Sequence, residues 1–593
     1  MPKTSQIAIE HLGIPLPAYL GILIKNKTFT IAEVGGENVY IHQPVAVYSK
    51  LSSSILRFIN KHGEKRNVKY VAATLADHLN YNDLFSKLWK RFDIVPILGH
   101  QLHFSPTQLA SFTSHHFEGN IFKVRLTAQN EVIPQPLVDL DEYARYSDPE
   151  SFQKLKALSK KFSGKRISFI SATPRGGGVA IMRHALLRLF SLLGVDSHWY
   201  VLEPRKEAFE ITKEKFHNVL QHESKASLTH SDIEVYKAWI QENAILFQSA
   251  FAKSDVIVID DPQPAGLIPY IKKINPNAFC IYRSHIHMDT EHMFDRNSPS
   301  AATWEFLWQS IKDADLFVSH PVVSFVPPHV SFEKVVFMPA TSDVFDGLNK
   351  PLLPSQRNYY LKLFDKYLLE TGQTPIDRSR PYLVQIARFD PAKGIPDVLE
   401  SYRMLRHSHS QIRPQLVIAG NGSIDDPDGD PLFHLTLETI RSARFSDLTH
   451  DIKIALLPHI DQILNTLVRE SYAVLQLSHQ DGFEVKVTEA LMKGKPVIAY
   501  KTGGIQLQLV SGLDGFLVEP VGNIDGVVRS LWRLFADKKL YRSFCRQAKK
   551  HYRRDVDTVH NALSWLYLAN KLMEKRTFTT NGSDIRSLLS ATP

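Results

Sequence analysis

The residues with the clearest chemical meaning lie in the stretch 478–491. It follows a strand-like apolar run at 473–477 and places two carboxylates, Asp481 and Glu489, eight positions apart. The pattern predicts a buried strand, a loop that carries Asp481, and a helix that carries Glu489 about two turns further on. Carboxylates spaced in this way can reach the two ends of one elongated ligand.

Two basic residues occupy the equivalent position after another predicted strand. Arg388 and Lys393 follow the run 382–387 and come just before a helix that Gly394 opens. A guanidinium and an ammonium near the positive end of a helix form an anion pocket, and arginine can engage two phosphate oxygens at once. Solvated surface charges are the alternative. Parallel sheets present their ligand-binding groups in this loop, which favours a phosphate site.

Three consecutive glycines, Gly176, Gly177 and Gly178, form the loop after the predicted strand 166–171. Glycines let backbone amides approach a phosphate or a sugar closely, with a helix N-terminus aimed at it. A simple tight turn is the alternative. The run lacks the spacing of the dinucleotide fingerprint, so we expect neither NAD nor another cofactor.

Polar residues also follow the predicted strand 256–259. Asp261 and Gln263 lie in a proline-containing turn there, where they could fix a sugar acceptor. A rigid loop with a solvated carboxylate is nearly as good an interpretation. Lys213 and His217 are weaker candidates for the same role.

A cluster of basic and imidazole side chains follows the predicted strand 278–282. Arg283 and His285 come first, and His287 and Asp289 could join His285 as metal ligands. No cysteine and no HExxH-type helix accompanies them, so we expect no metal. We expect His285 to hydrogen-bond a sugar hydroxyl, and a packed structural histidine is the alternative.

The elements that position these residues alternate between strand and helix from about residue 160 onward. Such alternation predicts parallel sheets covered on both faces. Two series of this kind predict an α/β protein with two doubly wound, Rossmann-like domains that face a cleft, preceded by an α+β extension. The predicted boundaries are an extension of docking or regulatory role (1–150), an acceptor domain (151–345), a linker (346–380), a phosphate or donor domain (381–545), carboxyl-terminal helices (546–575) and a flexible tail (576–593).

Composition excludes several classes of protein. A net charge of +9 over 593 residues, without a basic block, does not indicate nucleic-acid binding. The only cysteines, Cys280 and Cys545, exclude a disulfide framework and fit a reducing compartment. There is no secretory apolar core and no apolar run near the ~18 residues of a membrane span. We therefore expect a cytoplasmic protein without a membrane partner.

Taken together, these motifs resemble retaining glycosyltransferases of the two-Rossmann GT-B architecture. Within them the chain is similar to the trehalose phosphorylase and trehalose synthase group, which includes fungal enzymes. The matching segments are Gly176 to Ala180, Asp260 to Gly266, Arg283 to Ile286, Ala387 to Gly394, and Asp481 to Glu489.

The resemblance implies transfer of an α-glucosyl group with retention. Arg388 and Lys393 would hold the phosphate, and the loop of Gly482 and Phe483 would contact the donor glucose. Glu489 matches the carboxylate that binds a ribose in users of nucleotide sugars. The family usually has Glu at the position of Asp481, so the carboxylate here is one methylene shorter, which bears on activity and sugar preference.

The absence of a motif for a covalent nucleophile with an acid partner leads to a mechanistic hypothesis. Phosphate would act as the acid–base partner in a same-face substitution through a sugar cation. One reading is reversible phosphorolysis of trehalose, with trehalose, glucose, phosphate and glucose 1-phosphate as ligands. Two alternatives stay open: a trehalose synthase that uses nucleotide-glucose, and a catalytically weak sugar sensor. Formation of a homo-oligomer is also left open.

Overall fold

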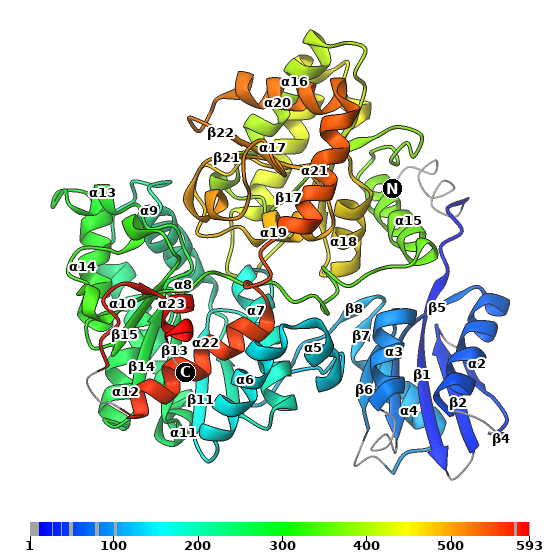
Figure 1. The fold of residues 1–593 in the computed structure, drawn as a ribbon, viewed down its shortest axis with the longest axis horizontal. Helices are drawn as coiled ribbons and strands as arrows, with labels where there is room; N and C mark the ends of the chain where they lie inside the picture. The colour runs from blue at the N-terminus through cyan, green and yellow to red at the C-terminus, as the bar shows by residue number, and fades with distance from the viewer. Residues whose placement is uncertain are drawn as a thin grey trace.

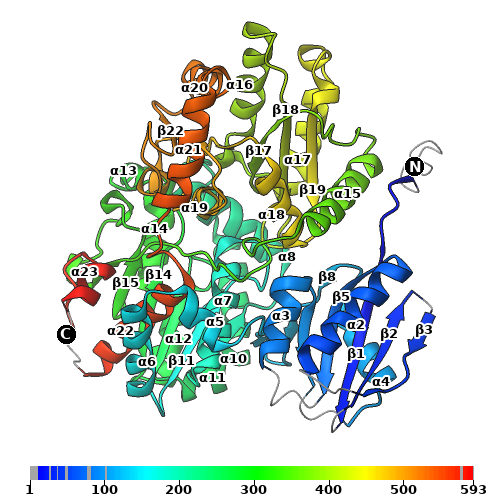
Figure 2. The same ribbon diagram turned by 45° about the vertical axis from the view of Figure 1, so that its right-hand side comes forward.

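The computed structural model describes residues 11–25, 28–36, 38–46, 51–76, 82–99, 103–574 and 578–591. Figure 1 shows an amino-terminal body in blue beside two larger α/β bodies, one from cyan to green and one from yellow to orange. Figure 2 shows the same three bodies after a 45° turn. No helix in the described part of the chain has the length and apolar character needed to cross a membrane.

The amino-terminal extension is built on a six-stranded mixed sheet of order β3-β2-β1-β5-β6, with β4 paired to β2. Strands β2 and β3 pair antiparallel as a hairpin. Helix α3 is amphipathic and buries Leu84 and Leu88. The elements are β1 (Leu16–Lys25), β2 (Thr28–Gly35), β3 (Asn38–Ile41), β4 (Val45–Ala46), α2 (Leu51–Arg66), β5 (Val68–Ala76), α3 (Asn82–Phe92), β6 (Val95–Leu98) and α4 (Pro106–His115).

The first Rossmann-like domain has a seven-stranded sheet of order β12-β11-β13-β14-β15-β16-β23, and all its pairs are parallel. One core lies between the sheet and helices α6, α7 and α22, and a second core lies on the other face under α10, α12 and α14. The strands are β11 (Arg166–Ser171), β12 (Asp196–Val201), β13 (Val256–Asp260), β14 (Phe279–Arg283), β15 (Leu316–Ser319) and β16 (Val335–Phe337). The helices are α6 (Pro149–Lys161), α7 (Gly178–Leu192), α10 (His230–Leu246), α12 (Ile268–Ile274) and α14 (Pro299–Ile311).

The second Rossmann-like domain has a six-stranded parallel sheet of order β19-β18-β17-β20-β21-β22. Helices α15, α18 and α19 cover one face, and α16, α17 and α20 cover the other. The strands are β17 (Tyr382–Ile386), β18 (Gln415–Asn421), β19 (Ile452–Leu457), β20 (Ala473–Gln476), β21 (Val497–Tyr500) and β22 (Gly515–Val518). The helices are α15 (Pro354–Glu370), α16 (Ile395–Ser408), α17 (Gly429–Arg441), α18 (Asp461–Glu470), α19 (Val485–Met492), α20 (Ile524–Ala536) and α21 (Lys538–His551). The predicted fold class, two doubly wound domains with an α+β extension, is confirmed.

The end of the chain returns to the first domain. Helix α22 (Thr558–Glu574) packs with α6 and α7, and strand β23 (Ser583–Asp584) adds to the sheet edge beside β16. Thr580 Oγ1 donates to the carbonyl of Val335 at 2.6 Å, and Ile585 is only 2% exposed. The flexible tail predicted for 576–593 is therefore wrong for residues 578–591. Tertiary pairing orders a segment whose polar sequence carries little local signal.

The extension docks on the crossover segment that joins the two Rossmann-like domains. Trp89 Nε1 donates to the carbonyl of Phe345 at 2.6 Å. Asp93 lies at the end of α3 and forms a buried ion pair with Lys350 at 2.6 Å. Because a buried ion pair that loses one partner is strongly destabilising, this contact fixes the extension to the crossover.

Candidate active site

The carboxyl ends of the two sheets enclose a cavity of about 460 Å³. Its walls come from the loops after β11, β13 and β14 of the first domain and after β17, β18, β19 and β20 of the second, and the amino-terminal extension and residues 346–348 of the crossover also line it. The crevice outside the carboxyl ends of parallel strands is where ligands bind in such folds. Ten of the twelve residues predicted from sequence line this cavity: Gly177, Gly178, Asp261, Gln263, His285, Arg388, Lys393, Asp481, Gly482 and Phe483.

The glycine loop lets the two domains approach each other closely. Gly176 has φ +103°, and a Cβ there would lie 2.1 Å from Ser423 Oγ of the second domain. Gly177 is the N-cap of α7, whose first-turn amides therefore point toward the cavity. A Cβ at Gly177 or Gly178 would meet nothing within 4 Å, so these two positions border open space. The close approach at Gly176 is to the second domain and not to a ligand. The expected binding of a phosphate or a sugar at Gly177 and Gly178 stays a prediction.

The two predicted cations both reach the cavity from the loop after β17. Lys393 Nζ forms ion pairs with Asp481 and, at 2.9 Å, with Glu484. Arg388 Nη1 lies 2.6 Å from Asp426 Oδ2, and 34% of the Arg388 side chain is exposed. Burial alone would lower both cations' pKa values, but these carboxylates raise them well above the usual range. Both side chains therefore remain cationic.

The loop after β20 brings its carboxylates against Lys393. Burial raises the pKa of Asp481 to about 7, whereas Lys393 outweighs the burial of Glu484 and lowers its pKa to about 2. Glu484 has φ +55° and its side chain caps α19. Asp481 is therefore the more easily protonated of the two carboxylates, and Glu484 supplies the fixed negative charge beside Lys393.

Glycine is required between these two carboxylates. A Cβ at Gly482 would lie 2.1 Å from the carbonyl oxygen of His285. The neighbouring Phe483 ring stacks on His320 with ring centroids 5.6 Å apart. His285 and His320 belong to the first domain, so this loop forms a direct contact between the domains.

His285 is held as a neutral hydrogen-bonding group. Burial lowers its pKa to about 4, and its Nε2 lies 2.9 Å from Asp260 Oδ1. Arg183 donates two hydrogen bonds to Asp260, at 2.7 and 2.6 Å, and keeps that carboxylate ionised. Nε2–H then donates to Asp260, which leaves Nδ1 as an acceptor that is buried without a partner among the described residues. The hydrogen bond from a sugar hydroxyl to His285 stays a prediction, and Nδ1 is the atom that would accept it.

Asp261 and Gln263 line the same wall. Asp261 has φ +69°, and its carboxylate accepts a hydrogen bond from the backbone amide of His285 at 2.7 Å. Burial raises the pKa of Asp261 to about 7, so its acid form is substantially populated near neutral pH. Gln263 lies beside His217, with which its side chain hydrogen-bonds, and both residues line the cavity.

Two predicted site residues do not line the cavity. Arg283 is 1% exposed and lies behind the wall, 3.2 Å from His320 Nδ1. Glu489 is 3% exposed and pairs with Lys486 Nζ at 2.8 Å, and Lys486 lines the cavity in its place. Both predictions placed the residues in the right loop or helix but did not account for the side chains in front of them.

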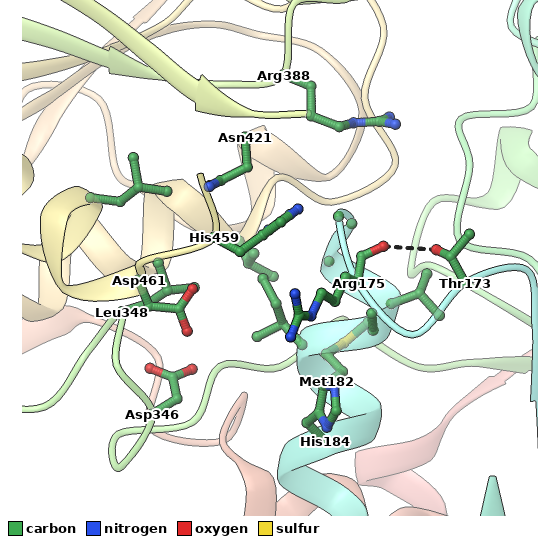
Figure 3. A pocket seen from close by; sticks show the side chains of 18 of the residues that line it. Thr173, Arg175, Met182, His184, Asp346, Leu348, Arg388, Asn421, His459 and Asp461 are labelled. Atoms are coloured by element: carbon green, nitrogen blue, oxygen red, sulfur yellow. Dashed lines mark hydrogen bonds between the residues drawn. The ribbon is translucent and has the colours of Figure 1, made fainter. Parts of the chain in front are cut away.

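Lys213, one of the weaker candidates named from the sequence, completes the site together with carboxylates that the motifs missed. It reaches across from the first domain to Asp390 at 2.6 Å and to Asp426 at 3.5 Å, so it shares these carboxylates with Arg388. Figure 3 shows a further group of polar side chains around the opening, with Arg175 facing the carboxylates of Asp346 and Asp461. Asp390 lies inside the Arg388–Lys393 motif and could have been singled out there.

The metal alternative receives no geometric support from the described residues, in which His, Cys, Asp and Glu do not gather in threes to hold an ion. The ring of His287 instead packs 4.3 Å from that of Phe325, and Asp289 pairs with His292.

Two family models match the chain over its Rossmann-like domains. Residues 169–327 match the amino-terminal domain of trehalose synthase, and residues 370–551 match glycosyl transferases group 1. A trehalose phosphorylase of Grifola frondosa is 36% identical over 545 residues, which are 88% of this chain and 73% of the relative. The chain belongs to the trehalose phosphorylase and trehalose synthase group of glycosyltransferases.

Other members of this group differ in how much of their length the chain spans. A trehalose phosphorylase of Pleurotus pulmonarius is 40% identical, with 76% of this chain aligned to 63% of the relative. A trehalose synthase of Thermococcus litoralis is 32% identical, with 73% of this chain aligned to 96% of the relative. Among solved structures, a trehalose-6-phosphate synthase superimposes with a TM-score of 0.53 at 13% identity, over 70% of this chain and 99% of that one. This likeness supports the GT-B fold alone.

Proposed function

We propose that this glycosyltransferase catalyses the reversible phosphorolysis of trehalose to glucose and α-glucose 1-phosphate with retention. The observation that carries the proposal is the position of Arg388 and Lys393, which enter the interdomain cavity opposite His285 and the N-terminus of α7. Relatives named trehalose phosphorylase, at 36–40% identity, support the same assignment.

The environment of Glu489 favours phosphate over a nucleotide as the ligand of the basic pair. By the resemblance, Glu489 matches the carboxylate that binds a ribose in users of nucleotide sugars. Here Lys486 pairs with Glu489 and stands between it and the cavity. Burial would lower the pKa of Lys486, but Glu489 raises it above its usual value, so Lys486 stays cationic and the pair persists. A ribose would have to displace a charge-assisted contact of 2.8 Å.

The mechanism follows from the groups that face the cavity. Phosphate bound by Arg388 and Lys393 lies on the face of the sugar from which glucose leaves. Its proton passes to the glycosidic oxygen as the C1–O bond breaks, and a phosphate oxygen then bonds to C1 on the same face. Preorganised donors that stabilise such developing charge lower the barrier by about 3 kcal/mol each. Neutral His285 accepts a hydrogen bond from a hydroxyl of the transferred glucose.

One pair of assays tests the proposal. Purified protein is given trehalose with phosphate and, separately, glucose with UDP-, ADP- or GDP-glucose, and the products are identified. Glucose 1-phosphate of α configuration is expected from the first mixture. Its absence there, with correctly folded protein, contradicts the proposal.

A trehalose synthase is the second candidate. The observation that supports it is the 32% identity to the trehalose synthase of Thermococcus litoralis, aligned over 96% of that relative. Trehalose formed from the second mixture, without phosphorolysis in the first, supports the synthase. No product in either mixture supports the sugar-sensing alternative.

A further inference from the structure

A second cavity, of about 490 Å³, lies on the second Rossmann-like domain and shares no lining residue with the active site. Its walls come from α15, the end of α18, the turn after α19, and α21. One carboxylate, Glu470, is present. Six cations surround it: Arg357, Arg469, Lys493, Lys495, Arg546 and Lys549.

The innermost of these cations are held in place by neutral oxygens. Arg469 Nη2 donates to the carbonyl of Asn349 at 2.7 Å, and Lys493 Nζ donates to the side-chain oxygen of Asn349 at 2.7 Å. Lys495 Nζ donates to the carbonyl of Ser471 at 2.6 Å. Such contacts fix the direction of the side chains but leave their charges uncompensated.

The charge balance of this cavity is strongly positive. Arg357 pairs with Glu470, while the other five cations form no ion pair with any carboxylate in the described part of the chain. Burial, assisted by Arg469, lowers the pKa of Lys493 to about 7, although Glu489 acts in the opposite direction. A preorganised group of like charges gains free energy when an anion enters.

We propose that this cavity is a binding site for an anion with two or more phosphoryl groups. Arginine forks and lysine ammonium groups match phosphate oxygens, and both kinds converge here. Lys493, whose pKa is about 7, is only partly charged at neutral pH. A single phosphate carries at most about two charges there, so it leaves part of the positive charge of the other four unpaired cations uncompensated. A di- or triphosphate compensates more of them and fits a cavity of 490 Å³.

Isothermal titration calorimetry of the full chain with tripolyphosphate, at about 0.1 M salt, tests this proposal. The test variant is Arg546→Gln/Lys549→Gln, because both side chains are exposed and neither forms a hydrogen bond or an ion pair with another described residue. The matched control is Lys539→Gln/Arg542→Gln, which removes the same charges from the same helix outside the cavity. We expect the test variant to bind at least tenfold more weakly and the control to bind like the wild type.

Three results would overturn the site. They are no binding to wild type, equal loss in both double variants, and loss on Arg388→Ala, which would place the anion in the active site. Inorganic phosphate that competes as well as tripolyphosphate would overturn the requirement for several phosphoryl groups. Adenosine triphosphate is titrated in parallel to identify the kind of ligand. An affinity equal to that of tripolyphosphate assigns the site to the phosphate chain alone, and a higher affinity assigns it to a nucleoside polyphosphate.

Discussion

At the scale of single residues, the site pairs each phosphate-binding cation with a carboxylate. Asp426 and Asp390 neutralise Arg388, and Asp481 and Glu484 neutralise Lys393. An incoming phosphate therefore competes with carboxylates that already satisfy the cations. This arrangement keeps Arg388 and Lys393 charged and oriented in the absence of ligand, so little reorganisation is needed during the reaction.

Replacing Arg388 tests whether this cation acts on the reaction or on the fold. We expect Arg388→Ala to lower kcat for phosphorolysis by about 10²- to 10³-fold, because one preorganised donor to the transition state is lost. The measurement is the initial rate of glucose 1-phosphate release, with unfolding curves recorded in parallel. Arg444→Ala removes an arginine whose side chain is 62% exposed and should keep wild-type kinetics. Equal rates for the two variants would exclude Arg388 from the site.

The raised pKa of Asp261 predicts that the stability of the fold depends on pH. Burial raises its pKa from 3.8 to about 7, so the folded state favours the protonated form. Its stabilising contribution is complete below the unfolded pKa and is lost as the pH rises from about 4 to 7. At about 1.4 kcal/mol per pKa unit the upper bound is roughly 4 kcal/mol. Asp261→Asn keeps a residue that tolerates φ +69° but cannot titrate. Urea unfolding at pH 5 and 7 should show a smaller loss of stability for the variant, and an identical loss would refute the shift.

At the scale of elements, strands that stand out as apolar runs could be predicted, even when they are short. The predicted bounds of β11 coincide with the observed ones, and the four-residue β20 lies within the predicted run 473–477. Strand β16 follows a polar segment and β22 begins with a glycine, so neither forms a run that stands out from its surroundings. β23 consists of Ser583 and Asp584 and exists only because β16 offers it an edge.

The same distinction applies to the site. Motifs after strands identified Arg388, Lys393 and the glycine loop, because loop position in a parallel sheet is a local property. The Lys213–Asp390 pair depends on how two domains meet, and no local pattern encodes that. Lys486 lies between Glu489 and the cavity because of how the side chains of α19 pack. The eight-residue spacing between Asp481 and Glu489 contains no information on that packing.

The loop between β20 and α19 yields a prediction at this scale. Gly482→Ala would place a Cβ 2.1 Å from the carbonyl of His285, which only a shift of backbone can relieve. We expect each domain to fold but the cavity to open, with kcat/KM for phosphate reduced at least 10-fold. Gly422→Ala is the control, since the nearest atom to a new Cβ there is Leu456 Cδ1 at 3.9 Å. Circular dichroism separates misfolding from loss of closure, and unchanged kinetics in Gly482→Ala would contradict the close contact.

At the scale of the whole molecule, polar contacts across the cleft hold the two Rossmann-like domains together. Lys213 reaches Asp390 at 2.6 Å, and Asn218 Nδ2 donates to Asp428 at 3.1 Å. Both donors come from the first domain and both acceptors from the second. Asp390 pairs both with Lys213, across the cleft, and with Arg388, which we propose binds phosphate. Closure of the domains and phosphate binding therefore involve the same carboxylate.

Lys213→Met therefore tests the closure of the domains. The Lys213 side chain is only 4% exposed, and its loss leaves Asp390 and Asp426 with Arg388 as their shared cation. Truncating one partner of such a pair removes the attraction across the cleft, so the ligand-free variant should adopt a more open form. Small-angle X-ray scattering is expected to show a larger radius of gyration, and KM for phosphate should change because Arg388 is held more tightly by the freed carboxylates.

Lys206→Met is the matched control, because the side chain of Lys206 is 88% exposed, and this variant should scatter like the wild type. If Lys213→Met also scatters like the wild type and keeps its KM for phosphate, the ion pair does not control closure, and the direct contact of Gly482 with His285 is then the dominant link between the domains.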